Sequence, residues 1–176
     1  MKHIKNLKIV ITAGASGIGS KIAQILSQAD AKVVICDKDQ EVLDQFSKNN
    51  PEVITLKADV SNEEEVTSFF NEIKDHFGEI NSLINNAGIA GPSAKLEDTN
   101  FNDWKNTLSV NLNGTFLCTK SAIPLLRSAG GGSIINIGST SSFMGTPLRS
   151  SYSATKWGLI GPVSYTHLTL PTILLV

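Results

Sequence analysis

Short runs of β-branched and apolar residues alternate along the chain with longer stretches in which apolar positions recur every three to four residues. The first pattern predicts buried strands and the second predicts amphipathic helices. The expected strands are 8–12, 32–36, 53–57, 82–85 and 133–137. The expected helices are 18–29, 41–48, 61–77, 101–128 with an interruption at Gly114, and one that starts at Ser151. This alternation is typical of an α/β fold with a parallel sheet.

The helix between the third and fourth strands carries the clearest boundary signals. Ser61 is followed three residues later by Glu64, the spacing of a capping box in which each side chain bonds a free backbone donor of the other residue. Glutamates at 63–65 lie in the first turn, where the helix dipole favours negative charge. Gly78 is expected to end the helix.

Composition narrows the class of protein. The chain has 176 residues, with 15 basic and 16 acidic side chains and 41% hydrophobic residues, which suits one domain with its own core. A net charge of −1 argues against binding to nucleic acid or a membrane surface, and no apolar run approaches the ~20 residues of a membrane span. Cys36 and Cys118 lie far apart, and the three histidines lack metal-ligand spacing. We therefore expect a reduced, cytoplasmic protein without a metal site.

A glycine-rich segment joins the first expected strand to the first expected helix. It reads Thr12, Ala13, Gly14, Ala15, Ser16, Gly17, Ile18 and Gly19. Glycines in such a turn let the backbone approach a pyrophosphate, and the helix N-terminus supplies free N–H groups and a positive dipole end. The segment predicts a phosphate site, with a purely structural turn as the alternative.

An acidic residue follows at the end of the second strand. Asp37 lies 18 residues after Gly19, where a carboxylate can accept both ribose hydroxyls of an adenosine and repel a 2′-phosphate. A helix cap is the alternative, which the neighbouring Lys38 and Asp39 keep open. The turn and Asp37 together favour a dinucleotide site.

Tyr152 and Lys156 form a second candidate constellation. Residues four apart share one face of a helix. A lysine cation beside a phenol stabilises the phenolate, which allows the phenol to give or take a proton near neutral pH. An ordinary exposed helix surface is the alternative for this spacing alone.

With further segments, these motifs resemble the short-chain dehydrogenase/reductase family over residues 8–161. The matching positions, in the family's order, are 12–19, Asp59, Val60, Asn85, Asn86, Ala87, Gly88, Asn111, Ser139, Tyr152 and Lys156. The resemblance implies a Rossmann-type, doubly wound parallel sheet with strand order 3-2-1-4-5. It also implies truncation after the fifth strand and part of the following helix, because the intact family fold has two more strands and a substrate-covering segment.

The resemblance assigns catalytic roles to four residues. Tyr152 is the implied general acid/base, and Lys156 supports it and binds the nicotinamide ribose. Ser139 is implied to bond the substrate oxygen, and Asn111 to hold a water in a proton relay from Lys156. A strand-end turn serine and a helix-kink residue are the respective alternatives for Ser139 and Asn111.

The resemblance also assigns cofactor contacts along the sheet edge. They are Thr12, Gly14, Ser16, Gly17, Ile18, Gly19, Asp37, Asp59, Val60, Asn86, Ala87, Gly88, Tyr152 and Lys156. Asp59 and Asn86 have an alternative, since both side chains can simply satisfy backbone groups at strand ends. Two departures stand out. Ala13 replaces the family's usual glycine, which puts the role of Gly14 in doubt, and Gly138 replaces a usual serine.

The implied function is reversible hydride transfer between NAD(H) and a secondary alcohol or ketone, of 3-oxoacyl-thioester, sugar, polyol or steroid type. Asp37 favours NAD over NADP. The resemblance further implies a homodimer or homotetramer, with a small-molecule substrate. The alternative function is a dinucleotide-binding sensor or scaffold without turnover, against which the complete catalytic set argues.

Residues 162–176 do not continue the pattern. Pro162 breaks the last helix, and 163–172 resembles a translated sequencing adapter, whose continuation also accounts for Val176 as the final codon. We expect a truncated dinucleotide-binding and catalytic domain over 1–161, a non-native tail over 162–176, and an inactive chain as written. A natural divergent C-terminus is the alternative.

Overall fold

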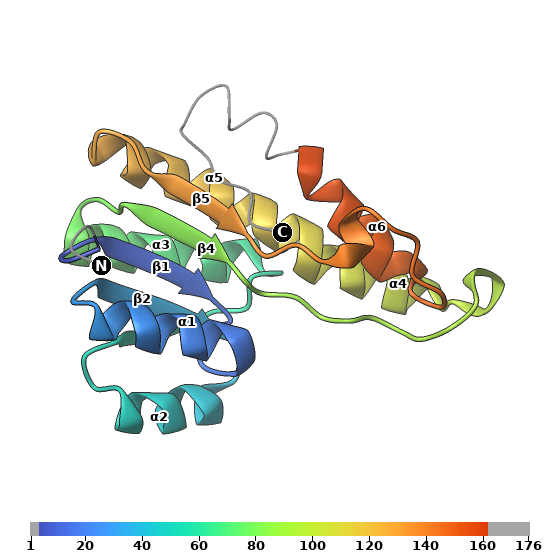
Figure 1. Ribbon diagram of the computed structural model, residues 1–176, viewed down its shortest axis with the longest axis horizontal. Helices are drawn as coiled ribbons and strands as arrows, with labels where there is room; N and C mark the ends of the chain where they lie inside the picture. Colours follow the sequence, from blue (N-terminus) through green and yellow to red (C-terminus); the bar gives the residue numbers. More distant parts are fainter. Residues whose placement is uncertain (1–3, 162–176) are drawn as a thin grey trace.

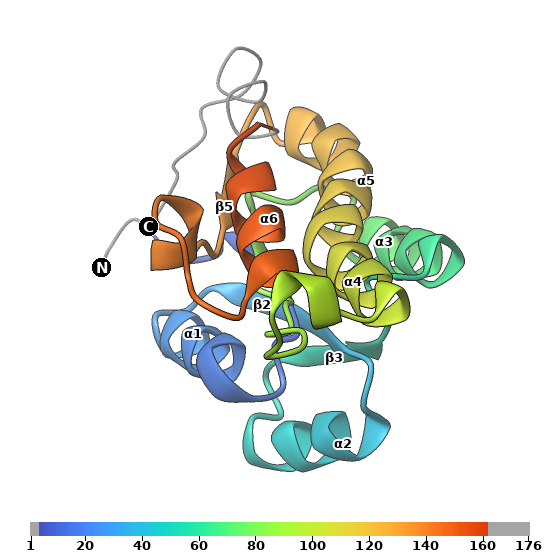
Figure 2. The same ribbon diagram turned by 90° about the vertical axis from the view of Figure 1, so that its right-hand side faces the viewer.

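A five-stranded parallel sheet forms the centre of the computed structural model, which describes residues 4–161 (Figure 1). Its strands are β1 (Lys8–Thr12), β2 (Lys32–Asp37), β3 (Ile54–Lys57), β4 (Ser82–Asn85) and β5 (Ser133–Asn136). The order β3-β2-β1-β4-β5 confirms the predicted Rossmann-type topology. Because all pairs are parallel, the carboxyl ends of the strands share one edge, which faces the viewer in Figure 2.

Helices cover both faces of the sheet. The α-helices are α1 (Gly17–Gln28), α2 (Gln40–Asn49), α3 (Glu63–Phe77), α4 (Phe101–Leu108), α5 (Gly114–Ser128) and α6 (Ser150–Gly158), of which α4 and α6 pack against each other past the carboxyl ends of the strands (Figure 1). On one face, Ile11 and Ile35 pack with Leu43 in the core beneath α1 and α2. On the other face, Leu83 packs with Phe69 in the core beneath α3 and α5. Burial of alternate strand residues on opposite faces fixes the register of each strand.

The start of α3 corrects the predicted capping box. The Ser61 hydroxyl is already used, because it donates to Asp59 Oδ1 at 2.7 Å. Asn62 caps the helix instead, its Oδ1 accepting from the backbone N–H groups of Glu64 and Glu65 at 3.0 and 3.2 Å. The prediction that Ser61 pairs with Glu64 is therefore wrong by one residue. Gly78 ends the helix in the left-handed conformation, as predicted.

The predicted helix over 101–128 is continuous but changes its winding. A π-helical turn, η2 (Ser109–Asn113), joins α4 to α5 and contains Asn111. Gly114 follows this turn, and a Cβ atom there would lie 2.8 Å from Val60 Cγ2. The glycine thus lets the helix approach the segment that follows β3.

Two short 3₁₀ helices, η1 (Leu96–Asp98) and η3 (Thr140–Ser142), lie in the loops that follow β4 and β5. The predicted tail over 162–176 lies outside the described residues. Among the helices of residues 4–161, none has the length and apolar composition of a membrane span. In the same residues, no three metal-ligating side chains come together.

Candidate active site

Thr12 ties the end of β1 to the end of β4. Its Oγ1 accepts hydrogen bonds from the backbone N–H groups of Asn86 and Ala87, both at 3.0 Å. The residue is 1% exposed. Thr12 is one of the predicted cofactor contacts. Its hydroxyl oxygen accepts from two backbone N–H groups, so the residue positions the backbone that follows β4.

Asn86 and Gly19 close the glycine turn. The Asn86 amide donates to the carbonyl oxygens of Thr12 and Ala13, both at 3.0 Å. A Cβ atom at Gly19 would lie 2.3 Å from the Ala13 oxygen and 2.5 Å from Asn86 Nδ2. The Asn86 side chain thus bonds backbone carbonyls at the strand ends, which was the alternative to a cofactor contact. The two close distances also explain why the turn needs a glycine at position 19.

Gly14 has a packing role that the sequence left in doubt. Its N–H donates to the Cys36 carbonyl at 2.9 Å, which places the turn directly on the end of β2. A Cβ atom there would lie 2.5 Å from Ile35 Cβ. Any larger residue at this position would push the turn away from the sheet.

The N-terminus of α1 faces the same edge of the sheet. Ser16 is the N-cap residue and its side chain makes no capping bond. Gly17 has a φ of +53° with open space around it, and Ile18 is 65% exposed. The first N–H groups of α1 are therefore available to an anion, as the predicted phosphate site requires.

A pocket of about 150 Å³ lies between the turn and the ends of β2, β3 and β4. It is lined by Ala13, Ser16, Asp37, Lys38, Ala58, Asp59, Val60, Ala87, Gly88, Ile89 and Val110. Asp39 caps α2 by accepting from the N–H groups of Glu41 and Val42, so the helix-cap alternative for Asp37 is wrong. The Asp59 carboxylate accepts from the Ser61 N–H at 2.9 Å, as its alternative proposed, while Asp59 also lines the pocket.

Tyr152 and Lys156 share one face of α6. Lys156 Nζ lies 5.7 Å from the centroid of the Tyr152 ring and donates to the Ile137 carbonyl at 2.7 Å. Lys156 is 6% exposed, and its burial lowers the pKa of its ammonium below the 10.5 of an ordinary lysine. The end of β5 therefore fixes the charged nitrogen beside the tyrosine ring.

Ser139 starts the loop that leads from β5 to α6. Its Oγ accepts from the Ser141 N–H at 3.2 Å, and Ser142 Oγ accepts from the Ser139 N–H at the same distance. Ser139 is thus a cap of η3, as its alternative proposed, and η3 packs against α6. Capping uses an oxygen lone pair and leaves the hydroxyl hydrogen to donate elsewhere.

Asn111 connects the loop after Gly88 to α6. Its Oδ1 accepts from the Ile89 N–H at 2.8 Å, while its Nδ2 donates to the Ile89 carbonyl at 2.9 Å and to Thr155 Oγ1 at 3.1 Å. Both amide hydrogens are used, so a water held by Asn111 must bind through one of its oxygen atoms. Asn111 lies in the π-helical turn η2, between α4 and α5.

Two connecting residues were missed by the sequence reasoning. Thr155 supplies the hydroxyl that bonds Asn111, and the Arg149 guanidinium donates to the carbonyls of Ala90 and Gly91 at 3.3 and 3.1 Å. These bonds join the loop after β4 to the start of α6. Their partners are distant in sequence, and no local pattern marks them.

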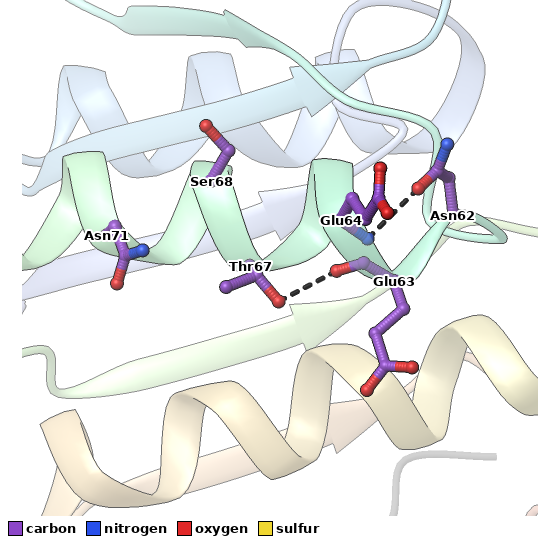
Figure 3. Close-up of a pocket in the computed structure, with 6 residues that line it drawn as sticks. All are labelled: Asn62, Glu63, Glu64, Thr67, Ser68 and Asn71. Atoms are coloured by element: carbon purple, nitrogen blue, oxygen red, sulfur yellow. Dashed lines mark hydrogen bonds between the residues drawn. The ribbon is translucent and has the colours of Figure 1, made fainter.

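A second hollow runs along the outer face of α3 (Figure 3). It is lined by Asn62, Glu63, Glu64, Thr67, Ser68 and Asn71. Asn62 caps the helix, and Thr67 Oγ1 donates to the Glu63 carbonyl at 2.8 Å. None of the predicted site residues lines this hollow, so it is separate from the pocket at the sheet edge.

Burial of Lys156 predicts a specific pH dependence of stability. Because the folded-state pKa is lowered, the unfolded chain binds more protons just below pH 10.5, and stability must rise with pH in that window. Lys156→Met removes the titrating ammonium and with it this dependence of stability on pH. We expect the free energy of unfolding of the unmodified protein, relative to Lys156→Met, to increase as the pH rises toward 10.5. Urea unfolding across that range measures it, and a constant or falling difference would contradict the burial.

Comparisons with known proteins agree with this geometry. A family model described as short chain dehydrogenase matches residues 7–171. An uncharacterised oxidoreductase of Bacillus subtilis is 39% identical over 163 residues, which cover 90% of this chain and 59% of that protein. The NADP-dependent (R)-specific alcohol dehydrogenase of Lentilactobacillus kefiri is 36% identical over 158 residues, which cover 88% of this chain and 62% of that protein.

A solved structure is similar as well. The crystal structure of levodione reductase matches with a TM-score of 0.88 at 30% identity, over 93% of this chain and 66% of that chain. These matches confirm the resemblance predicted from the motifs. The chain spans about three fifths of the length of the two curated relatives.

Proposed function

The chain belongs to the short-chain dehydrogenase family, and we propose that it transfers hydride between NAD(H) and a secondary alcohol or ketone. One observation carries the proposal. Gly88 lines the dinucleotide pocket, and a Cβ atom there would lie 3.4 Å from Asn111 Oδ1 and 3.9 Å from Lys156 Nζ. The pocket therefore leads directly to the candidate catalytic side chains.

The described residues fit a dinucleotide. The closed turn at Gly14 and Gly19 and the free N–H groups at the start of α1 suit a pyrophosphate. Asp37 lies at the end of β2, where it would accept the hydroxyls of the adenosine ribose. Ala58, Val60 and Val110 line the same pocket with apolar surface, which suits an adenine ring.

The catalytic roles follow from the groups that surround Tyr152. The bound dinucleotide supplies the hydride and its electron pair. During reduction, Tyr152 would donate its phenolic proton to the substrate oxygen, and the Lys156 cation would stabilise the phenolate that remains. Ser139 would donate a hydrogen bond to the same oxygen as negative charge develops and would keep its own proton. In the oxidation direction, the Tyr152 phenolate would take the proton from the alcohol, and the hydride would return to the dinucleotide.

Cofactor preference is the first test of this function. The Asp37 carboxylate would face a 2′-phosphate as a like charge, so we expect kcat/KM of the full-length protein to be at least about tenfold higher with NAD than with NADP. Steady-state kinetics with both cofactors measures the ratio. Asp37→Asn should narrow it, because the amide bears no charge. An equal or higher kcat/KM with NADP would overturn the preference.

The substrate and the assembly belong to the same proposal. A small alcohol or ketone would enter beside Tyr152, and a homodimer or homotetramer in the cytoplasm is the assembly that we propose. Cys36 and Cys118 are both free and buried, and burial raises the pKa of the Cys36 thiol to about 12. Thiols kept protonated in a core suit a reducing compartment.

A further inference from the structure

Ala13 has a backbone conformation that an alanine rarely adopts. Its φ is +49°, in the left-handed region where glycine carries no steric cost. Three other described residues with a side chain share a positive φ: Asn6, Asp30 and Leu148. Asparagine and aspartate tolerate this region well. An alanine in this region has a steric cost in free energy that glycine would avoid. The Ala13 methyl group is therefore not explained by the backbone conformation.

The surroundings hold this conformation from several sides. The Ala13 carbonyl accepts from Asn86 Nδ2 at 3.0 Å. The next residue, Gly14, donates its N–H to the Cys36 carbonyl at 2.9 Å. These contacts involve backbone atoms of the turn, so they would persist with glycine at position 13.

The methyl group contributes to neither hydrophobic core. Ala13 is half-buried and is absent from both clusters of core residues, whereas its neighbour Ala15 belongs to one of them. Packing therefore does not explain why alanine occupies this strained position. What Ala13 does contact is the pocket, whose wall it forms with Ser16 and Asp37.

Strand register places Ala13 beside Asp37. Thr12 pairs with Cys36 across β1 and β2, so Ala13, which follows β1, comes next to Asp37, the last residue of β2. The bond from Gly14 to the Cys36 carbonyl keeps the two backbones close. A methyl group at position 13 thus takes up room next to the carboxylate that would bind the adenosine ribose.

We propose that the Ala13 methyl group helps to exclude a 2′-phosphate, and therefore NADP, from this pocket. The inference rests on the proposed dinucleotide function. The charge of Asp37 alone discriminates weakly between NAD and NADP. Lys38 lines the same pocket, and its cation would attract the 2′-phosphate that Asp37 repels. Steric exclusion at Ala13 adds a barrier that Lys38 does not offset. Ala13 is in this account a specificity-determining residue for the cofactor.

Ala13→Gly tests the proposal in the full-length protein. NADH and NADPH are titrated separately by calorimetry, without substrate, and each variant is also followed by thermal unfolding. We expect the ratio of the NADPH Kd to the NADH Kd to fall by about tenfold, the lower end of what one carbon is worth in a binding pocket. We also expect Tm to rise by about 1–3 °C, because glycine relieves the left-handed strain.

Asn6→Gly is the matched control. Asn6 also has a positive φ of 64°, but it precedes β1, at the opposite edge of the sheet from the pocket. Its substitution should leave the ratio of the two Kd values unchanged. An unchanged ratio in Ala13→Gly, with or without a higher Tm, would overturn the inference while leaving the proposed function intact. Failure of the unsubstituted protein to bind either dinucleotide would overturn both.

Discussion

Tyr152→Phe is expected to lower the turnover of the full-length protein by at least about 100-fold, the low end of what a general acid/base contributes. The substitution removes the phenolic proton and keeps the ring, whose centroid lies 5.7 Å from Lys156 Nζ. Packing on α6 should therefore survive. Pre-steady-state and steady-state reduction of a ketone, with NADH binding measured in parallel, separates lost chemistry from lost affinity.

Ser153→Ala is a suitable control for this experiment. It alters the adjacent residue on the same helix, where a buried hydroxyl has no hydrogen-bond partner in the described part of the chain. Turnover should stay close to that of the unsubstituted protein. Near-normal turnover in Tyr152→Phe would place the acid/base elsewhere. If the protein were instead a dinucleotide-binding sensor without turnover, Tyr152→Phe would leave its response to the dinucleotide unchanged.

Gly14→Ala should destabilise the fold by about 3 kcal/mol, the upper end of the usual cost of overpacking. The new Cβ atom would lie 2.5 Å from Ile35 Cβ and 2.6 Å from Ile35 Cγ2, and Ile35 is fully buried in β2. Neither side can move without separating the turn from the sheet. For a domain of this size, Tm should fall by about 6–12 °C, which differential scanning calorimetry measures.

Gly145→Ala provides the matched control for Gly14→Ala. A Cβ atom at Gly145 meets nothing within 4 Å, and its backbone is outside the left-handed region. The same chemical change should therefore leave Tm nearly unchanged. Equal Tm values for Gly14→Ala and the unsubstituted protein would show that the turn does not pack on β2 as described.

The sheet was predictable because its signals are local. Each strand is a short run of β-branched residues, and the intervening helices carry apolar residues at helical spacing. The observed strands differ from the predicted ones by single residues, as at Ile54, where β3 begins one residue late. Strand order came from the resemblance, since periodicity alone does not say which parallel strands are neighbours.

The start of α3 shows why a local signal can fail. Ser61 with Glu64 and Asn62 with Glu65 are equally good capping patterns one residue apart. The choice is made by Asp59, which takes the Ser61 hydroxyl, while Glu65 accepts from the Asp59 N–H at 2.9 Å. Two overlapping capping patterns therefore compete, and the hydrogen bonds of Asp59 decide between them. Helix propensity does not describe such bonds.

The candidate site was predictable in its members but only partly in their roles. Sequence motifs identified Thr12, Asn86 and Asn111. In the structure, each of these side chains forms hydrogen bonds with backbone groups of a neighbouring segment. The strained φ of Ala13 and the bond from Lys156 to the Ile137 carbonyl were not predicted. Both depend on segments far apart in sequence that meet only when the sheet is assembled.

Transfer of deuterium from the dinucleotide to the product is the decisive measurement of hydride transfer by this protein. NADH with both hydrogens at the nicotinamide C4 position replaced by deuterium is incubated with the full-length protein and a panel of ketones, and the alcohol product is examined by mass spectrometry and NMR. We expect one deuterium on the carbinol carbon of the product, and a rate of labelled-product formation that is at least about 100-fold lower in Tyr152→Phe than in the unsubstituted protein. Product without deuterium at that carbon, or equal rates of labelled-product formation in the two proteins, would contradict the proposed hydride transfer.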